Sequence, residues 1–281
     1  MKKQQLTLFC IGYGYCAQQL AETLGPKTQI YATARTDEQV SQLTLQGIRP
    51  VDIRKPDLAA LPQGAHWLVS TPPGEGGCPG FDAFGDAARE AGWIGYLSTT
   101  GVYGDLDGGW AFEWTALNPQ SEPGKRRAIA EAQWLSTDGP VQIFRLPGIY
   151  GPGRSAFDRL KTGKARRIIK DGQVFSRVHV EDIISALLAS MERPRTGGIY
   201  HPCDDEPGPP QDVIAYAAKL LGLPVPPDLP IESVNLSPMA RRFYDECKRV
   251  SNARTKSELG WAPTYPNYRV GLSSIHALET A

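Results

Sequence analysis

Residues 6–17 of the chain, Leu6-Thr7-Leu8-Phe9-Cys10-Ile11-Gly12-Tyr13-Gly14-Tyr15-Cys16-Ala17, decide the fold. A short apolar run ends in two glycines, and residues 18–24 then carry apolar side chains at helical spacing. This order predicts a strand, a tight turn and a helix. Residues 29–34 are rich in β-forming residues and predict a second strand, so one βαβ unit is complete.

The spacing Gly12-x-Gly14-x-x-Ala17 has a steric reason. Gly12 permits the turn out of the strand, Gly14 lets the backbone approach a pyrophosphate without a Cβ in the way, and Ala17 keeps helix and strand close. Tyr13 and Tyr15 belong to the same turn. We therefore expect these five residues to bind a dinucleotide at the helix N-terminus, and the alternative is a glycine-rich turn without a ligand.

Arg35 and Thr36 follow the second predicted strand, where a site for NAD usually carries an acid. An arginine with a neighbouring hydroxyl, from Thr33 or Thr36, suits a 2′-phosphate instead. The sequence therefore favours NADP(H) as cofactor, with NAD(H) as second choice. The alternative is a solvated surface arginine, because Asp37 and Glu38 lie close by.

Strand and helix patterns alternate through the rest of the N-terminal half. Strands are predicted at 65–70, 93–98 and 141–146, and helices at 36–46, 81–91 and 125–137. This alternation predicts an α/β fold, a Rossmann doubly wound parallel sheet with a small C-terminal substrate lobe. Residues 1–150 are assigned to the Rossmann domain, and 151–281 to a mixed region that completes the sheet and forms the lobe. Thr71 and Pro72, after the strand at 65–70, are expected to line the cofactor crevice or to form a plain turn.

Three further segments resemble one enzyme family. Tyr96–Asp105 resembles the strand and loop that carry the catalytic Ser or Thr in extended short-chain dehydrogenases/reductases, the family of NAD-dependent epimerases and dehydratases. Arg145–Gly153 and Val178–Ile183 resemble two later blocks of that family. The resemblance implies that the Thr99 hydroxyl contacts the substrate oxygen, with Ser98 as its neighbour. Both side chains could instead bond to nearby backbone.

The chain departs from this family at the Tyr-x-x-x-Lys motif, whose tyrosine is the general acid/base. The matching helix contains Glu131, a glutamate common in the family. That alignment places Pro123 at the tyrosine position and Arg127 at the lysine position. Arg127 can supply positive charge to a ribose, but it cannot exchange protons at neutral pH. The chain thus resembles atypical members of the family, and Tyr103 and Tyr150 are the motif tyrosines that could substitute.

Two functions remain open at this point. The first is an atypical NADP(H)-dependent oxidoreductase or epimerase/dehydratase-like enzyme, with a nucleotide sugar or another small carbonyl compound as substrate. The second is a dinucleotide-binding sensor or scaffold without catalysis. A homodimer is common in the resembling family. The basic residues between 161 and 170 are interpreted either as contacts for a phosphorylated substrate or as a solvated helix face.

Composition excludes several other classes. Thirty basic and thirty acidic residues give a formal charge of zero, which does not favour nucleic acid or an anionic membrane. The apolar run after the basic residues 1–5 is too short for a signal peptide or a membrane span. The five cysteines form no CxxC pair, and the four histidines show no metal-ligand spacing. We therefore expect a cytoplasmic protein with reduced thiols and no metal.

Overall fold

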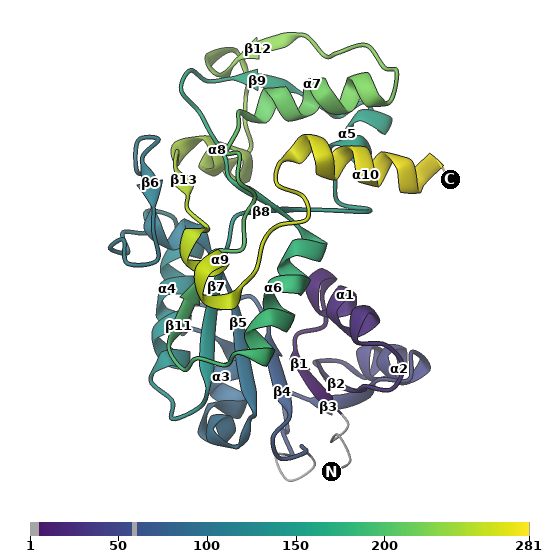
Figure 1. Ribbon diagram of the computed structural model, residues 1–281, viewed down its shortest axis with the longest axis vertical. Helices are drawn as coiled ribbons and strands as arrows, with labels where there is room; N and C mark the ends of the chain where they lie inside the picture. Colours follow the sequence, from purple (N-terminus) through teal and green to yellow (C-terminus); the bar gives the residue numbers. More distant parts are fainter. Residues whose placement is uncertain (1–5, 58–60, 281) are drawn as a thin grey trace. The chain divides into compact units, whose positions relative to one another are not determined.

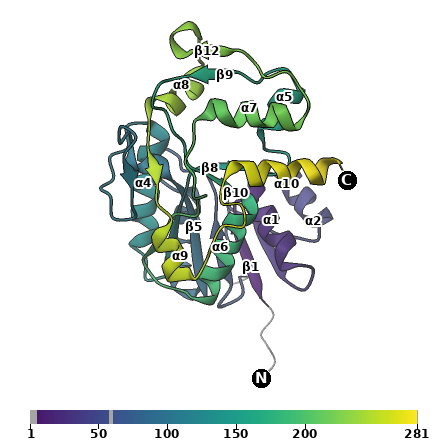
Figure 2. The ribbon, with the colours of Figure 1, turned by 45° about the horizontal axis from the view of Figure 1, so that its top comes forward.

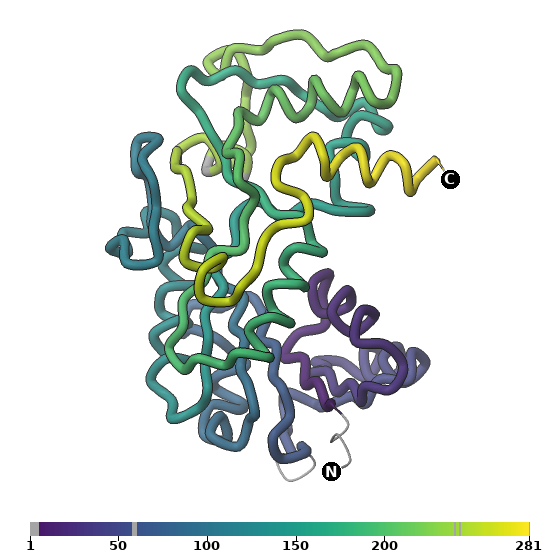
Figure 3. The backbone as a smooth tube through the Cα atoms, in the orientation of Figure 1, coloured from purple at the N-terminus to yellow at the C-terminus, as the bar shows by residue number. Residues whose placement is uncertain are grey.

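The computed structural model describes residues 6–57 and 61–280, which form two compact units that alternate along the chain (Figures 1 and 3). Unit 1 comprises Met1–Val102, Glu122–Arg145 and Ile184–Tyr200, and unit 2 comprises Tyr103–Ser121, Leu146–Ile183 and His201–Ala281. The basic residues 1–5, weighed above as a leader, lie outside the described part.

A seven-stranded sheet forms the centre of unit 1, in the order β11-β7-β5-β4-β1-β2-β3. The strand pairs whose register is defined all run parallel. The strands are β1 (Thr7–Ile11), β2 (Gln29–Ala34), β3 (Arg49–Asp52), β4 (His66–Val69), β5 (Trp93–Thr99), β7 (Val141–Leu146) and β11 (Gly198–Tyr200). The predicted Rossmann doubly wound parallel sheet is confirmed, and β3 and β11 are strands that the sequence did not reveal.

Helices connect these strands. They are α1 (Tyr15–Leu24), α2 (Asp37–Leu45), α3 (Pro79–Phe84), α4 (Glu122–Leu135) and α6 (Val180–Glu192). The first four follow helical patterns in the sequence, whereas α6 is a helix that the sequence did not reveal. The helix predicted at 81–91 was wrong in its bounds, because α3 begins at Pro79 and passes at Gly85 into a 3-10 helix that ends at Glu90. Proline fits the first turn of a helix, where its missing N–H costs no bond.

The strand order reverses between β1 and β4, which are neighbours in the sheet. In this register Ile11 lies beside Val69. The chain therefore leaves both strands at the same edge of the sheet, with Gly12 after one and Ser70 after the other. Open parallel sheets bind ligands at such a switch point, and Gly12 and Thr71, two of the predicted site residues, lie there.

Aromatic packing under the sheet fixes this arrangement. The rings of Phe9, Trp67 and Phe84 meet edge to face at centroid distances of 5.0–6.4 Å, and all three are buried. Phe81 of α3 packs in the same way on Trp134 of α4. Burial of side chains of this size supplies most of the driving force for folding, so the core holds α3 and α4 against the strands.

Unit 2 contains short elements around its own apolar core (Figure 2). Its strands form three parallel pairs: β8 (Gly148–Tyr150) with β10 (Arg177–His179), β9 (Arg167–Ile169) with β12 (Asp228–Pro230), and β6 (Trp110–Ala111) with β13 (Arg249–Val250). Its helices are α5 (Ala156–Lys161), α7 (Pro210–Leu220), α8 (Pro238–Asp245), α9 (Ala253–Leu259) and α10 (Tyr268–Thr280). Within the residues that the structure describes, no helix is long and apolar enough to cross a membrane.

Candidate functional site

Gly12 forms the turn that leaves β1. Its φ of +94° lies in the left-handed region, and a Cβ built there would approach Ser70 Oγ and Thr71 N to 3.0 Å. The Gly12 N–H donates to Thr33 Oγ1 at 2.9 Å, and Ser70 Oγ donates to the Gly12 carbonyl at 2.9 Å. Contacts from β2 and from the loop after β4 therefore hold the turn in place, and only glycine fits it.

Gly14 has no comparable structural reason to be glycine. Its φ is −97°, which any residue can adopt, and a Cβ built there meets nothing within 4 Å. It is the N-cap of α1, whose first turn has no side-chain cap and no acidic residue. Ala17 is buried, as close packing of helix and strand requires, while Tyr13 and Tyr15 flank Gly14 and are half-buried. The open space at Gly14 and the positive end of the helix dipole fit a bound pyrophosphate.

Arg35 is exposed at the end of β2, and its backbone N–H donates to Gln39 Oε1 at 2.8 Å. Thr36 is the N-cap of α2, because its hydroxyl accepts a hydrogen bond from the Gln39 N–H. The nearby carboxylates have other partners: Asp37 lies 3.2 Å from Arg54, and Glu38 accepts from Gln42. In the described part of the chain no carboxylate lies within 4 Å of the Arg35 guanidinium.

The loop after β4 lies at the same edge of the sheet. The Thr71 N–H donates to the Ile11 carbonyl at 3.1 Å, and Pro72 is exposed beside it. Further along, the Cys78 N–H donates to Gln133 Oε1 at 2.8 Å, and Gln133 Nε2 donates to the Gly76 carbonyl at 3.2 Å. A side chain of α4 thus fixes the loop that lines the switch point.

Ser98 and Thr99, at the end of β5, differ in what their hydroxyls do. Ser98 is buried and donates to Glu131 of α4. Arg145 of β7 donates to both oxygens of that carboxylate, at 2.7–3.1 Å, and forms a buried ion pair with it. Thr99 is half-buried, and its Oγ1 accepts from the Gly101 N–H at 3.1 Å. The Thr99 O–H is therefore left to donate to another group.

Arg127 lies one helical turn before Glu131 on α4. Its Nη1 donates to the Leu97 carbonyl at 2.6 Å and to Tyr96 Oη at 3.1 Å, so the guanidinium is anchored at the end of β5. Burial raises the pKa of Tyr96, and the charge of Arg127 opposes the rise. Pro123 occupies the first turn of α4 and has no proton to give.

All of the predicted site residues lie in unit 1: Gly12, Tyr13, Gly14, Tyr15, Ala17, Arg35, Thr36, Thr71, Pro72, Ser98, Thr99 and Arg127. Three partners were not foreseen as part of the site. Gln133 fixes the loop after β4, Arg145 pairs with Glu131, and Arg54 pairs with Asp37. Only Arg145 had a sequence signal, its place in the family-like stretch that begins with it.

The two tyrosines considered as substitute acids belong to unit 2. Tyr103 is buried, and its Oη lies 2.6 Å from Nε2 of the buried His201. His201 Nδ1 lies 3.0 Å from the Ser251 carbonyl and 3.8 Å from the buried carboxylate of Glu113. Tyr150 packs edge to face on His179, and burial raises its pKa. Each of these two tyrosines thus packs against a histidine ring of unit 2.

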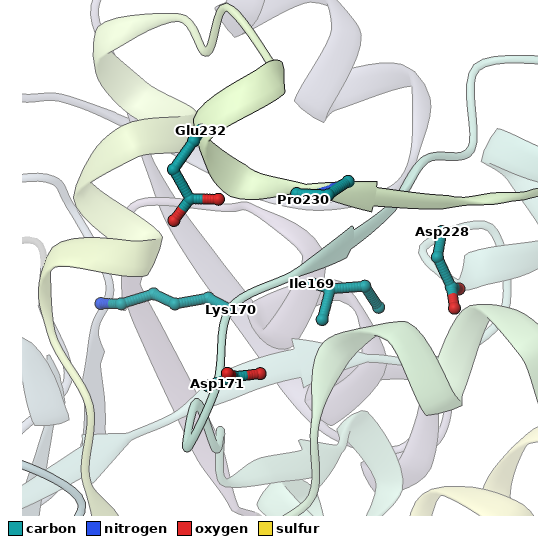
Figure 4. Close-up of a pocket in the computed structure, with 6 residues that line it drawn as sticks. All are labelled: Ile169, Lys170, Asp171, Asp228, Pro230 and Glu232. Atoms are coloured by element: carbon teal, nitrogen blue, oxygen red, sulfur yellow. The ribbon is translucent and has the colours of Figure 1, made fainter.

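The basic stretch between residues 161 and 170 is largely paired. Lys161 lies 2.5 Å from Glu279 and Arg167 lies 2.5 Å from Asp228, while Lys170 donates to the Tyr244 carbonyl. A hollow of about 550 Å³ beside it is lined by Ile169, Lys170, Asp171, Asp228, Pro230 and Glu232 (Figure 4). Three carboxylates around one lysine do not suit a phosphate. The alternative of a solvated helix face was also wrong, because α5 ends at Lys161 and Arg167–Ile169 form β9.

The fold and these motifs can be compared with those of proteins of known structure. The chain is 17% identical to a dTDP-glucose 4,6-dehydratase from Streptomyces venezuelae, solved with NAD, over 98% of its own length and 97% of that chain, with a TM-score of 0.75. It therefore has the fold of the NAD-dependent epimerases and dehydratases, as the sequence motifs indicated. It is 49% identical, over 96% of its length and 98% of that chain, to a functionally unknown conserved protein from Silicibacter pomeroyi, with a TM-score of 0.89. At that identity the chain belongs to the family of this conserved protein.

Two curated proteins are also similar to the chain. The chain is 32% identical to a 3-diazoavenalumate denitrifying reductase from a Streptomyces species, over 52% of its own length and 51% of the relative. It is 29% identical to Protein YeeZ from Escherichia coli strain K12, over 92% of its length and 95% of the relative. The match to the reductase thus spans about half of that enzyme. No family model matches the chain.

Proposed function

We propose that this protein is an NADP(H)-binding, atypical short-chain dehydrogenase/reductase that acts as an oxidoreductase, or an epimerase/dehydratase-like enzyme, on a small carbonyl compound. The observation that carries the proposal is the open space at Gly14. It lies at the uncapped N-terminus of α1, directly after β1 at the switch point of the sheet. A bound pyrophosphate would give a reason for glycine at a position where neither φ nor packing demands it.

The surroundings of Arg35 support NADP(H) over NAD(H). NAD is usually held by a carboxylate on its ribose hydroxyls, whereas a 2′-phosphate needs a cation. Arg35 is exposed at that position, and the neighbouring Asp37 is turned to Arg54. The objection that Asp37 neutralises Arg35 is thereby removed.

The residues at the end of β5 suit substrate orientation. A nicotinamide bound at the switch point would exchange a hydride with a substrate carbon. Thr99 would donate its free O–H to the substrate oxygen, since its lone pair already accepts from Gly101. Arg127 would hold a permanent positive charge near the ribose, because a guanidinium does not titrate at neutral pH.

The relatives support a reductive reaction. One curated relative is named a reductase, and the dehydratase with the same fold was solved with NAD. A nucleotide sugar is a weaker choice of substrate than another carbonyl compound, because the hollow beside the basic stretch carries three carboxylates. The cytoplasmic location and the homodimer stay predictions.

A second candidate is a dinucleotide sensor without catalysis, which the environment of α4 favours. Pro123 takes the place of the acid, and Arg127 is anchored to Tyr96 and Leu97. Neither side chain can move a proton to the substrate.

Calorimetric titration with NADPH, NADP and NAD tests the proposal. We expect submillimolar binding of NADPH, and an Arg35→Gln variant should bind NADPH more weakly while its affinity for NADH changes little. If the protein binds no dinucleotide, both the enzyme and the sensor proposals are wrong. Oxidation of bound NADPH by a panel of aldehydes, ketones and nucleotide sugars, followed at 340 nm, separates the enzyme from the sensor.

A further inference from the structure

Two carboxylates flank Arg35, the residue that the proposed function assigns to the 2′-phosphate. Asp37 follows it by two residues in the first turn of α2. Asp52 is the last residue of β3. It pairs with Ala34 in the register of β2 and β3, and Ala34 directly precedes Arg35. Left alone, these two negative charges would weaken the attraction of Arg35 for a phosphate.

A single side chain engages both carboxylates. Arg54 Nε donates to Asp52 Oδ1 at 2.9 Å, and Arg54 Nη2 donates to Asp52 Oδ2 at 2.7 Å. The same Nη2 donates to Asp37 Oδ1 at 3.2 Å, and the Arg54 N–H donates to Asp52 Oδ1 at 2.9 Å. These hydrogen bonds hold the pKa of Asp52 at about 2, so its carboxylate stays charged and in need of a partner.

The four groups make a balanced set. Arg35 and Arg54 supply two positive charges, and Asp37 and Asp52 supply two negative ones. Because Arg54 is the group that takes both carboxylates, Arg35 has none within 4 Å in the part of the chain that is described. Without Arg54 the set would carry one net negative charge and two carboxylates free to bind ribose hydroxyls, which is the chemistry of a site for NAD.

We propose that Arg54 determines the dinucleotide preference of this site, by holding Asp37 and Asp52 away from Arg35 and so keeping Arg35 free for the 2′-phosphate. This role rests on the proposed function. Arg54 is a positioning residue, since it acts through the two carboxylates. It is also a specificity residue that no sequence motif marks, because it lies 19 positions after Arg35 on a different strand connection.

The expected effect follows from Coulomb's law. In a water-like dielectric, removing one positive charge from the neighbourhood of a 2′-phosphate weakens binding of that phosphate by a factor of about five. The ratio of the Kd for NADPH to the Kd for NADH should therefore rise about five-fold in Arg54→Gln. Since the groups are exposed, the change should shrink as salt is raised from 0.05 M to 1 M.

The experiment measures the Kd for NADPH and for NADH by calorimetry in the full chain. The variants are Arg54→Gln and Arg54→Gln combined with Asp37→Asn, which returns the net charge of the set to zero and should restore the wild-type ratio. Arg49→Gln is the matched control, because it removes the same charge from the start of β3, three residues before Asp52, where Arg49 bonds Tyr31 Oη. The control should change the ratio less than two-fold.

Each outcome has a separate meaning. If the wild type binds NADPH and Arg54→Gln leaves the ratio unchanged, or weakens both dinucleotides equally, the role of Arg54 is overturned while the proposed function stands. If the wild type binds neither dinucleotide, the proposed function itself fails. Should Arg54→Gln not fold, Asp37→Asn alone is expected to tighten NADPH by about five-fold and to leave NADH unchanged, and no tightening would overturn the role.

Discussion

Replacing Glu131 with glutamine removes the negative partner of an ion pair at the centre of unit 1. The Glu131 and Arg145 side chains are only 2% and 4% exposed, and Arg145 donates to both carboxylate oxygens. Glutamine keeps the size of the side chain and an oxygen that can accept from Ser98. The substitution therefore isolates the charge, and it takes the charged partner Glu131 away from the buried Arg145 guanidinium.

The expected loss is large, because a buried charge left without its partner costs about 3–5 kcal/mol. For a chain of this size, 1 kcal/mol corresponds to about 2–4 °C in Tm, so Glu131→Gln should lower the Tm by roughly 6–20 °C. Urea unfolding followed by circular dichroism gives the midpoint and the slope m. We expect the midpoint to fall while m stays constant.

A matched control residue pairs with the same helix. Glu75 pairs with Arg126 of α4 at 3.4 Å, but its side chain is 90% exposed. Glu75→Gln should leave the urea midpoint within error of the wild type. Glu131→Leu with Arg145→Met should recover most of the stability, since apolar packing replaces a buried pair at little cost. A Glu131→Gln midpoint equal to that of the wild type would refute the reasoning.

Two further substitutions test individual positions. Gly12→Ala should lower the free energy of unfolding of the ligand-free protein by roughly 1–3 kcal/mol, because the residue has φ +94° and its Cβ would crowd Ser70 and Thr71; an unchanged Tm would contradict the strained turn. Burial raises the pKa of Asp204 to about 8, so its contribution to stability is lost as pH rises from about 4 through 8. Asp204→Asn should therefore become more stable relative to the wild type as the pH rises from 5 to 8. Urea midpoints that depend on pH equally in the two proteins would contradict this prediction.

Local patterns were sufficient for the elements that surround the switch point. The bounds of β2 and β7 were predicted at 29–34 and 141–146, because each segment is rich in β-forming residues. β3 was missed because it has four residues, one of them Pro50, and a single buried side chain, Val51. β11 has three residues, and pairing with β7 rather than its own pattern makes it a strand. Short edge strands take their structure from their neighbours.

The candidate site divides in the same way. Gly12, Gly14 and Arg35 follow from the chain because backbone geometry and strand order place them. The partners of the other side chains do not, because Ser98 and Glu131 are 33 residues apart and Cys78 and Gln133 are 55 apart. Contacts of this kind decide that the Ser98 hydroxyl is engaged while the Thr99 hydroxyl can still donate. They form only when α4 is packed on β5.

Gly14 tests the central claim, that a dinucleotide binds at the N-terminus of α1. Aspartate is a favoured N-cap residue, so Gly14→Asp should leave the Tm unchanged or raise it, since the position is extended and a Cβ meets nothing within 4 Å. The same side chain would fill the space for the pyrophosphate and repel its charge. Calorimetry should show submillimolar NADPH binding to the wild type and none to a folded Gly14→Asp variant. Equal affinity in both proteins would contradict the account.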